Sequence, residues 1–468
     1  MSFLTRRKTL ELGAPEGASH LKKSLGWPHL IALGVGAIIG TGIYTLTGVA
    51  AGLAGPGVIL SFAIAGIICA GAALCYAEMA SLTPQAGSAY TYSYVTLGEG
   101  IAWIIGVSLI LEYTLVCSAV SVGWSGYASG LIRQAGWGFP EALLDKGIVD
   151  VPAIFIALVV TGVLLAGTRE SATINFVLVC IKLVALAAFV AFTLPHFNAA
   201  NFTPFAPFGF GAHEIDGKKY GVMGAAAIIF FAFYGFDAIS TAAEEAKNPK
   251  RDLTIGIVGS MALCTVIYMV IAACALGVVP FQPFSKSPEP LAYALKQMGQ
   301  PTAAAMIAGA AVVAMPTVIM VFMFGQSRVF FAMARDGLLP RALAGVDRRG
   351  VPTAVTVMTG LIAAVFAGLV PLDEIASLAN AGTLAAFIAV CCAVMVLRRR
   401  APELPRPFVT PLVWVIAPAT IAGCLYLFSS LQTKTMLFFV GANLIGAVVY
   451  LLYGRTKSRL ASADTGVF

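Results

Sequence analysis

Charged side chains are scarce in this chain of 468 residues, where they make up 11% of the total against 59% hydrophobic residues. Soluble globular proteins carry about a quarter charged residues. So large a deficit excludes a big water-soluble fold, because the chain lacks the polar surface to cover its own apolar side chains. The net charge of +7 does not indicate nucleic-acid binding, since the basic residues are confined to short segments between apolar runs. A lipid bilayer is the medium that such a chain requires.

Histidine and metal-binding patterns of cysteine are also nearly absent. The chain has four histidines, all in polar segments or at the ends of apolar runs, and nine cysteines without the CxxC spacing of a metal site. We therefore expect the cysteines to be small core residues, and we expect no metal ion, no cofactor and no enzymatic activity. An integral membrane enzyme stays the alternative from another class, and it would need paired carboxylates or a Ser/Lys dyad at membrane depth. A channel would need a continuous polar face on several helices, whereas this sequence has isolated charges.

Twelve apolar runs are long enough to cross a bilayer, which takes about 20 residues per helix. Of the 29 lysines and arginines, 21 fall on the side of the N-terminus, 7 on the other side, and Lys182 lies within a run. Because such a bias marks the cytoplasmic side, we expect a multi-pass inner-membrane protein with both termini in the cytoplasm. The polar N-terminal segment predicts no cleavable signal peptide. The runs are 29–52, 56–84, 98–131, 151–167, 172–195, 221–245, 254–280, 302–334, 352–370, 375–397, 409–430 and 435–454.

Glycine is concentrated in the first and sixth runs, where it weakens helical structure at membrane depth. Unwound backbone inside a bilayer is tolerated only where it lines a cavity or packs inside protein. We expect both helices to be interrupted, near Gly40–Gly42 and near Ala232–Gly235. The odd offset of five runs predicts two five-helix units of opposite orientation, with a binding site at the interruptions. The alternative is that the glycines only permit close helix packing. The residues concerned are Gly34, Gly36, Gly40, Gly42, Gly48, Gly224 and Gly235.

Five strings in the chain carry a family resemblance: IIGTGIYTLTGVAA, CYAEMAS, PQAGSAYTYSY, FFAFYGFDAISTAAEEAKNPKRD and FAMARDGLLP. They resemble the amino acid–polyamine–organocation superfamily, and within it a bacterial member of the cationic amino acid transporter family. The resemblance implies an all-α membrane protein of 12 transmembrane helices with the leucine-transporter fold. In that fold a cytoplasmic segment (1–28) precedes a transport core (29–397) of two inverted five-helix repeats (29–195 and 221–397). Residues 398–468 would hold helices 11 and 12 and the cytoplasmic C-terminus.

The resemblance also implies a substrate site made of backbone groups. Thr41 and Gly42 would present N–H groups to the carboxylate of an amino acid. The carbonyl groups of the second interruption would take its ammonium group together with that of the first, and Phe231 would form part of a gate. The residues expected to offer these carbonyl groups are Ile38, Phe231, Ala232 and Tyr234.

Lys182 lies near the middle of the fifth run, where a cation is costly unless it faces the protein interior. We expect its ammonium group to point at the carbonyl groups of Gly34 to Ile38. Burial favours the neutral form of a lysine, so Lys182 is a candidate for proton coupling. In proton-driven relatives a lysine at the matching place fills the site where sodium-coupled members bind the ion. The alternative is a structural pairing with backbone carbonyl groups.

Glu112 lies in the middle of the third run, and three roles stay open for it. Its carboxylate would face the substrate side chain, bind a proton or form a structural hydrogen bond. Glu78 and Asp237 lie nearer the cytoplasmic half. The charges around Glu244, Arg251 and Asp336 suggest either solvated loop charge or a cytoplasmic network.

Phe322 stands where eukaryotic cationic transporters carry a small residue, and Tyr234 replaces a common aliphatic residue. The large ring of Phe322 would shorten the side-chain pocket. We therefore expect a permease that imports small or medium neutral L-amino acids by proton symport, driven by the proton gradient. An exchanger or a cationic amino acid importer stays the alternative. The expected partners are the amino acid and the bilayer, without nucleic acid, and the sequence leaves a small membrane partner or an oligomer undecided.

Overall fold

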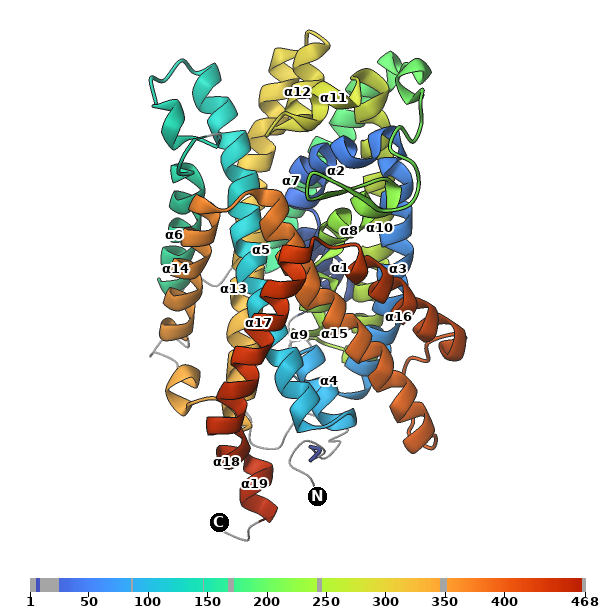
Figure 1. Ribbon diagram of the computed structural model, residues 1–468, viewed down its shortest axis with the longest axis vertical. Helices are drawn as coiled ribbons and strands as arrows, with labels where there is room; N and C mark the ends of the chain where they lie inside the picture. The colour runs from blue at the N-terminus through green and yellow to red at the C-terminus, as the bar shows by residue number, and fades with distance from the viewer. Residues whose placement is uncertain are drawn as a thin grey trace.

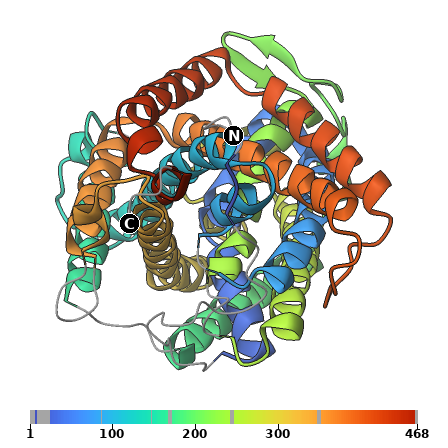
Figure 2. The same ribbon diagram turned by 90° about the horizontal axis from the view of Figure 1, so that it is seen from below.

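Long helices that lie side by side make up most of the computed structural model (Figure 1). It describes residues 6–8, 25–85, 87–145, 147–166, 172–241, 246–345 and 352–464. The first described residues, 6–8, and the last helix, α19 (Arg459–Asp464), lie at the same end of the bundle, at the bottom of Figure 1. We call this end the termini face and the opposite end the far face. Seen from below (Figure 2), the red C-terminal helix lies at the edge of the bundle.

Each of the twelve predicted runs contains helix among its described residues. In the described parts of the chain, eight helical stretches are long and apolar enough to cross a membrane, and the first of them, Trp27–Leu82, covers the first predicted run and residues 56–82 of the second. Three further apolar helices are shorter, at 15 to 17 residues. The unbroken helices are α3 (Val58–Leu82), α5 (Glu99–Gln134), α6 (Val151–Leu165), α7 (Ala172–Thr193), α10 (Pro249–Val278), α13 (Pro301–Arg335), α14 (Thr353–Leu369), α15 (Leu372–Arg400), α16 (Val413–Ser429) and α17 (Thr433–Val449).

The first and sixth predicted runs are interrupted, as their glycines predict. In the first broken helix, α1 (Trp27–Ile38) ends before the extended residue Ile39, and a π-helical turn η1 (Gly42–Leu46) leads into α2 (Thr47–Ala54). In the second broken helix, α8 (Val222–Ile229) tightens into the 3₁₀ turn η6 (Phe230–Phe233). The extended residue Tyr234 follows, and α9 (Phe236–Thr241) begins after Gly235.

The structure also holds elements that the sequence did not predict. A two-stranded antiparallel hairpin, β1 (His213–Ile215) and β2 (Lys218–Tyr220), pairs His213 with Tyr220, so the expectation of an all-α chain needs this small correction. A buried helix, α4 (Ala89–Thr96), lies at the termini face (Figure 1). Two short helices, α11 (Phe281–Ser285) and α12 (Pro290–Gln297), lie at the far face (Figure 1). The other short elements are η2 (Gly55–Gly57), η3 (Glu141–Leu143), η4 (Leu194–His196), η5 (Ala199–Phe202), η8 (Arg341–Ala344), η9 (Tyr450–Gly454), α18 (Arg455–Lys457) and α19 (Arg459–Asp464).

Small residues let the helices approach closely. A Cβ added at Gly34 of α1 would lie 2.5 Å from Ser260 Oγ of α10, and one added at Gly66 of α3 would lie 2.7 Å from Thr265 Cγ2 of the same helix. Lipid tails are as apolar as the helices, so association inside a bilayer depends on such van der Waals contact more than on water exclusion. The glycines therefore hold α1 and α3 against α10.

Ionic and hydroxyl groups tie the helices together at the termini face. Arg398 donates to Glu78 at 2.7 Å. Asp336 accepts from Lys8 at 3.1 Å and from Tyr90 at 2.9 Å, so the N-terminal segment is anchored to the end of α13. Asp336 thus takes part in a network, whereas Glu244, also expected there, lies outside the described residues.

At the far face, Asp150 caps the start of α6. Its carboxylate accepts from the Ala153 amide at 3.0 Å and from the Ser125 hydroxyl of α5. Its backbone N–H donates to the Gly368 carbonyl group of α14 at 3.0 Å. Burial raises the pKa of Asp150 to about 6, although hydrogen bonds with Ser125 and Ala153 act in the opposite direction.

The raised pKa of Asp150 predicts a pH-dependent stability. The folded protein holds this proton more tightly than the unfolded chain, so the stabilising contribution is fully present below the ordinary value of 3.8 and is lost as the pH rises through about 6. We expect Asp150→Asn to remove a pH dependence on the order of 2 kcal/mol from the unfolding free energy across this window. Thermal unfolding in detergent from pH 4 to 7 measures it. The control is Asp216→Asn in the exposed hairpin turn, and an unchanged pH slope in Asp150→Asn would contradict the prediction.

Candidate functional site

The two interruptions touch each other in the middle of the bundle. A Cβ added at Gly42 would lie 2.4 Å from the Cα atom of Ala232, and one added at Gly235 would lie 2.6 Å from Ala37 Cβ. Gly235 also has a φ of 112°, a backbone angle that residues other than glycine rarely adopt. Glycine is therefore required at Gly42 by close approach and at Gly235 by both approach and backbone conformation. The structure brings together the two segments that the sequence singled out separately.

At the first interruption, the carbonyl group of Ile38 accepts a hydrogen bond from the Tyr268 hydroxyl of α10 at 2.7 Å. Thr41 lies against α5, where a Cβ added at Gly123 would lie 2.5 Å from Thr41 Oγ1. The helical segment that follows has first amides without partners inside that segment. Thr41 and Gly42 are therefore placed where such amides are available. Tyr268 was missed by the sequence analysis, because a tyrosine within an apolar run gives no signal of its hydroxyl partner.

At the second interruption, aromatic rings surround the extended backbone. The rings of Phe231 and Tyr234 lie 5.0 Å apart, and the Tyr234 amide donates to the Phe231 carbonyl group at 3.3 Å. The Tyr234 hydroxyl donates to Asn380 Oδ1 of α15. Asn380 was also missed from the sequence, since nothing in its own run marks it as a neighbour of the sixth run.

The predicted site residues are shut off from both faces in this conformation. Each has an exposed fraction of at most 4%. A small molecule can reach the interruptions only after helices move, which is the behaviour of a carrier that opens to one side at a time. The buried residues for which exposure is recorded are Ile38, Thr41, Phe231, Ala232, Tyr234, Glu112, Phe322 and Lys182.

Lys182 of α7 reaches the first broken helix. Its Nζ donates to the Gly36 carbonyl group at 2.7 Å and to Thr317 Oγ1 of α13 at 3.1 Å. Gly36 lies within the range of Gly34 to Ile38 that the sequence analysis named. One ammonium group thus connects α7, α1 and α13, one helical turn before the interruption.

Phe322 and Glu112 lie on the two long helices α13 and α5. The Phe322 ring packs edge to face on Tyr113 of α5, with 5.3 Å between ring centroids. Tyr113 in turn donates to Asp237 at 2.8 Å. Glu112 is fully buried, and the Thr383 side chain of α15 lies beside its carboxylate.

Comparison with known proteins decides the family. The amino acid permease family model matches residues 25–453. The chain belongs to the amino acid permease family. It is 44% identical over 466 residues to a branched-chain amino acid permease of Bacillus subtilis, covering 97% of this chain and 98% of that protein. A methylthioribose transporter of Bacillus subtilis is 40% identical over 469 residues, covering 98% of this chain and 100% of that protein.

The cationic branch of the family is also represented. The vacuolar cationic amino acid transporter 2 of Arabidopsis thaliana is 40% identical over 421 residues, which cover 86% of this chain and 64% of that protein. The resemblance drawn from the five strings to the amino acid–polyamine–organocation superfamily and its cationic transporters is thereby confirmed. This permease is a multi-pass membrane protein whose relatives carry small molecules.

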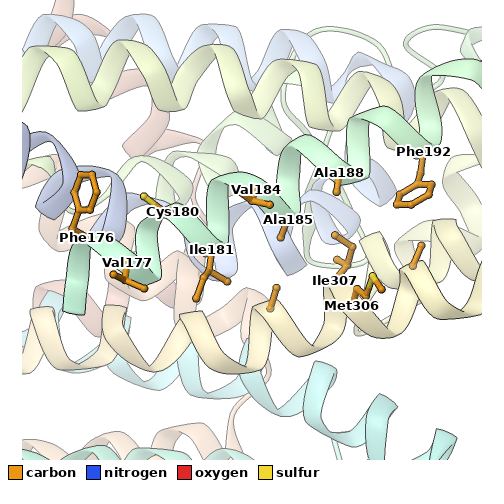
Figure 3. A pocket seen from close by; sticks show the side chains of 12 residues that line it. Phe176, Val177, Cys180, Ile181, Val184, Ala185, Ala188, Phe192, Met306 and Ile307 are labelled. Atoms are coloured by element: carbon orange, nitrogen blue, oxygen red, sulfur yellow. The ribbon is translucent and has the colours of Figure 1, made fainter. Parts of the chain in front are cut away.

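An apolar groove lies between α7 and α13, away from the interruptions. It has a volume of about 470 Å³ and runs between α7 and α13, with Phe176 and Phe192 near its two ends (Figure 3). Its lining is apolar, and Val184 and Met306 are more than half exposed. Lys182 is fully buried on the same helix. The groove is therefore part of the lipid-facing surface and does not mark the substrate site.

The geometry at Gly235 predicts a larger effect of an added methyl group there than at an unpacked glycine. Gly136 has a φ of 70° and nothing within 4 Å of an added Cβ, so Gly136→Ala measures backbone strain alone. We expect Gly136→Ala to cost about 1 kcal/mol and Gly235→Ala about 2–4 kcal/mol of stability, because the second also drives a methyl group into Ala37. Thermal unfolding of both variants in detergent measures the difference. Equal losses would show that the contact between the two interruptions contributes nothing.

Proposed function

We propose that this permease imports neutral amino acids of small or medium size, with branched-chain side chains favoured, by proton symport. The contact that carries the proposal is the meeting of Gly42 with Ala232, since it joins two interrupted helices at one buried place. Backbone N–H groups at the start of a helical segment attract a carboxylate, and carbonyl groups freed at the end of one attract an ammonium group. An α-amino acid carries both charges a few ångströms apart.

The aromatic lining supports a neutral substrate of limited length. Phe322, Phe231 and Tyr234 supply large rings, and all are almost fully buried. A pocket closed by rings excludes long cationic side chains, because it has no room and offers no solvent to their charge. Two relatives described as branched-chain amino acid permeases support the same size class. Glu112 keeps a cationic amino acid as the alternative substrate, and amino acid exchange stays the alternative mode.

Lys182 supports proton coupling. A protonated amine binds the Gly36 carbonyl group and Thr317, and so fastens α7 to α1 and α13. Loss of the proton weakens this link and favours another packing of the helices, because only a group with different contacts in two states shifts their equilibrium. In this proposal the termini face is cytoplasmic, twelve spans follow the leucine-transporter fold, and the protein lies in the bacterial inner membrane.

A competition panel in proteoliposomes tests the proposal as a whole. Purified protein is reconstituted into vesicles with an acidic exterior, and uptake of radiolabelled L-leucine is measured against the twenty amino acids and methylthioribose. We expect leucine, isoleucine and valine to compete more strongly than arginine and lysine. Dominant competition by methylthioribose would assign the substrate to the chemistry of the second relative. Uptake that requires amino acid inside the vesicle would indicate an exchanger.

Replacing Lys182 separates proton coupling from binding. We expect Lys182→Ala to abolish accumulation driven by a pH gradient while it retains substrate binding, because the backbone site does not use this side chain. Lys182→Arg should also impair accumulation, since arginine keeps its proton in a protein. Lys434→Ala, a substitution of an exposed residue at the start of α17, serves as the control. An alanine variant at Lys182 that still concentrates substrate under an imposed gradient would refute this role.

Replacing Phe322 tests the size of the pocket. We expect Phe322→Ser to extend the substrate range toward larger or cationic amino acids, because the ring it removes packs on Tyr113 beside the broken helices. Room for one more methylene group changes the discrimination between two substrates by about 10- to 200-fold. The same substitution at Phe324, which is 47% exposed two residues along α13, is the control. An unchanged competition profile for Phe322→Ser would remove the size argument.

A further inference from the structure

Asn380 of α15 contacts both the end of α8 and the interruption that follows it. It is fully buried. Its Nδ2 donates to the carbonyl groups of Ala227 at 2.5 Å and Ile228 at 3.4 Å, near the end of α8. Its Oδ1 accepts from the hydroxyl of Tyr234, the residue at the interruption itself. One side chain from another helix thus joins the end of α8 to the first residue past the 3₁₀ turn.

The chemistry of these contacts explains why an asparagine suits this place. At its end α8 tightens into the 3₁₀ turn η6, and the Asn380 amide donates to the carbonyl groups of Ala227 and Ile228 just before this turn. A carbonyl group left without a donor inside a bilayer is costly, because the hydrocarbon region contains no water that could donate to it. An asparagine side chain supplies amide hydrogens and a carbonyl oxygen on one rigid plane. Aspartate has the oxygen but no donor, and leucine has neither.

The hydrogen bond between Tyr234 and Asn380 restrains the ring and the backbone of Tyr234 as well as its hydroxyl group. The Tyr234 ring packs on Phe231 at 5.0 Å and on Phe230 at 5.7 Å between centroids. The backbone of Tyr234 is extended, and Gly235 follows with its positive φ. Holding the end of the tyrosine side chain therefore restrains the ring beside Phe231 and the carbonyl group that follows it. Without this restraint Tyr234 would be free to move, because the glycine that follows it, Gly235, has a flexible backbone.

We propose that Asn380 is a positioning residue for the substrate, which acts through Tyr234 to hold the second interruption in its binding geometry. The inference rests on the proposed function, in that the substrate binds at the interruptions. It adds a residue of α15 that does not itself need to touch the amino acid. Its consequence is that substrate affinity depends on the pair Asn380 and Tyr234 as one unit.

A double-mutant cycle tests the proposal. Equilibrium binding of radiolabelled L-leucine to the full-length purified protein is measured for Asn380→Ala, Tyr234→Phe and the double variant, with thermal unfolding followed in parallel. We expect each single variant to raise Kd by about tenfold, which is the effect of losing roughly one buried hydrogen bond. The double variant should be no weaker than the worse single variant, because both substitutions break the same link. Asn380→Leu should bind as weakly as Asn380→Ala, since leucine can neither donate to Ala227 nor accept from Tyr234.

The control is Asn443→Ala. Asn443 donates to the Phe439 carbonyl group within its own helix, α17, at 3.0 Å, and its loss should leave Kd within twofold of the wild type. A Kd for Tyr234→Phe within twofold of the wild type would overturn the proposal, even where Asn380→Ala fails to fold. Multiplying effects, about a hundredfold in the double variant, would overturn it as well. Absence of leucine binding in the wild-type protein would instead count against the proposed substrate class, and the cycle would then be run with the ligand that wins the competition panel.

Discussion

Backbone that leaves its helix inside a membrane must find other hydrogen-bond partners, and this constraint shapes the centre of the permease. The two interruptions meet where Gly42 lies on Ala232. Donors from three separate helices serve the broken backbone around them: Tyr268 of α10 to Ile38, Lys182 of α7 to Gly36, and Asn380 of α15 to Ala227. The surrounding bundle is thus organised around carbonyl groups that the broken helices release.

These donors differ in how they respond to a change of pH. A tyrosine hydroxyl and an asparagine amide keep their hydrogens at any physiological pH, so they hold the broken helices without responding to the medium. An amine is the donor in this set that loses its proton most readily when it is buried. In the proposed symport mechanism the same kind of acceptor therefore has two functions. Neutral donors maintain the shape of the site, and the lysine makes one of its contacts depend on the proton.

Small residues allow both the close packing and the movement that a carrier needs. At the far face, a Cβ added at Gly48 would lie 3.1 Å from Pro290, and one added at Gly130 would lie 2.2 Å from the Glu289 carboxylate. The short helix α12 therefore sits directly on the first broken helix and on α5. At the termini face, Asp336 binds Lys8 and Tyr90. The two interruptions thus lie between an end that is packed through glycine contacts and an end that is held by an ion pair and a hydroxyl group.

The amino-acid sequence by itself determined the twelve helical runs, the two interruptions and the inward direction of Lys182. Each follows from a local rule: about 20 apolar residues span a bilayer, glycine weakens a helix, and a charge at membrane depth turns away from lipid. Only the tertiary structure decided that Tyr268 donates to the carbonyl group of Ile38 and that Asn380 donates to that of Ala227. In a run that is apolar on all sides, no periodic pattern shows how a helix is rotated, and the depth and rotation of each helix select which polar side chain meets which carbonyl group.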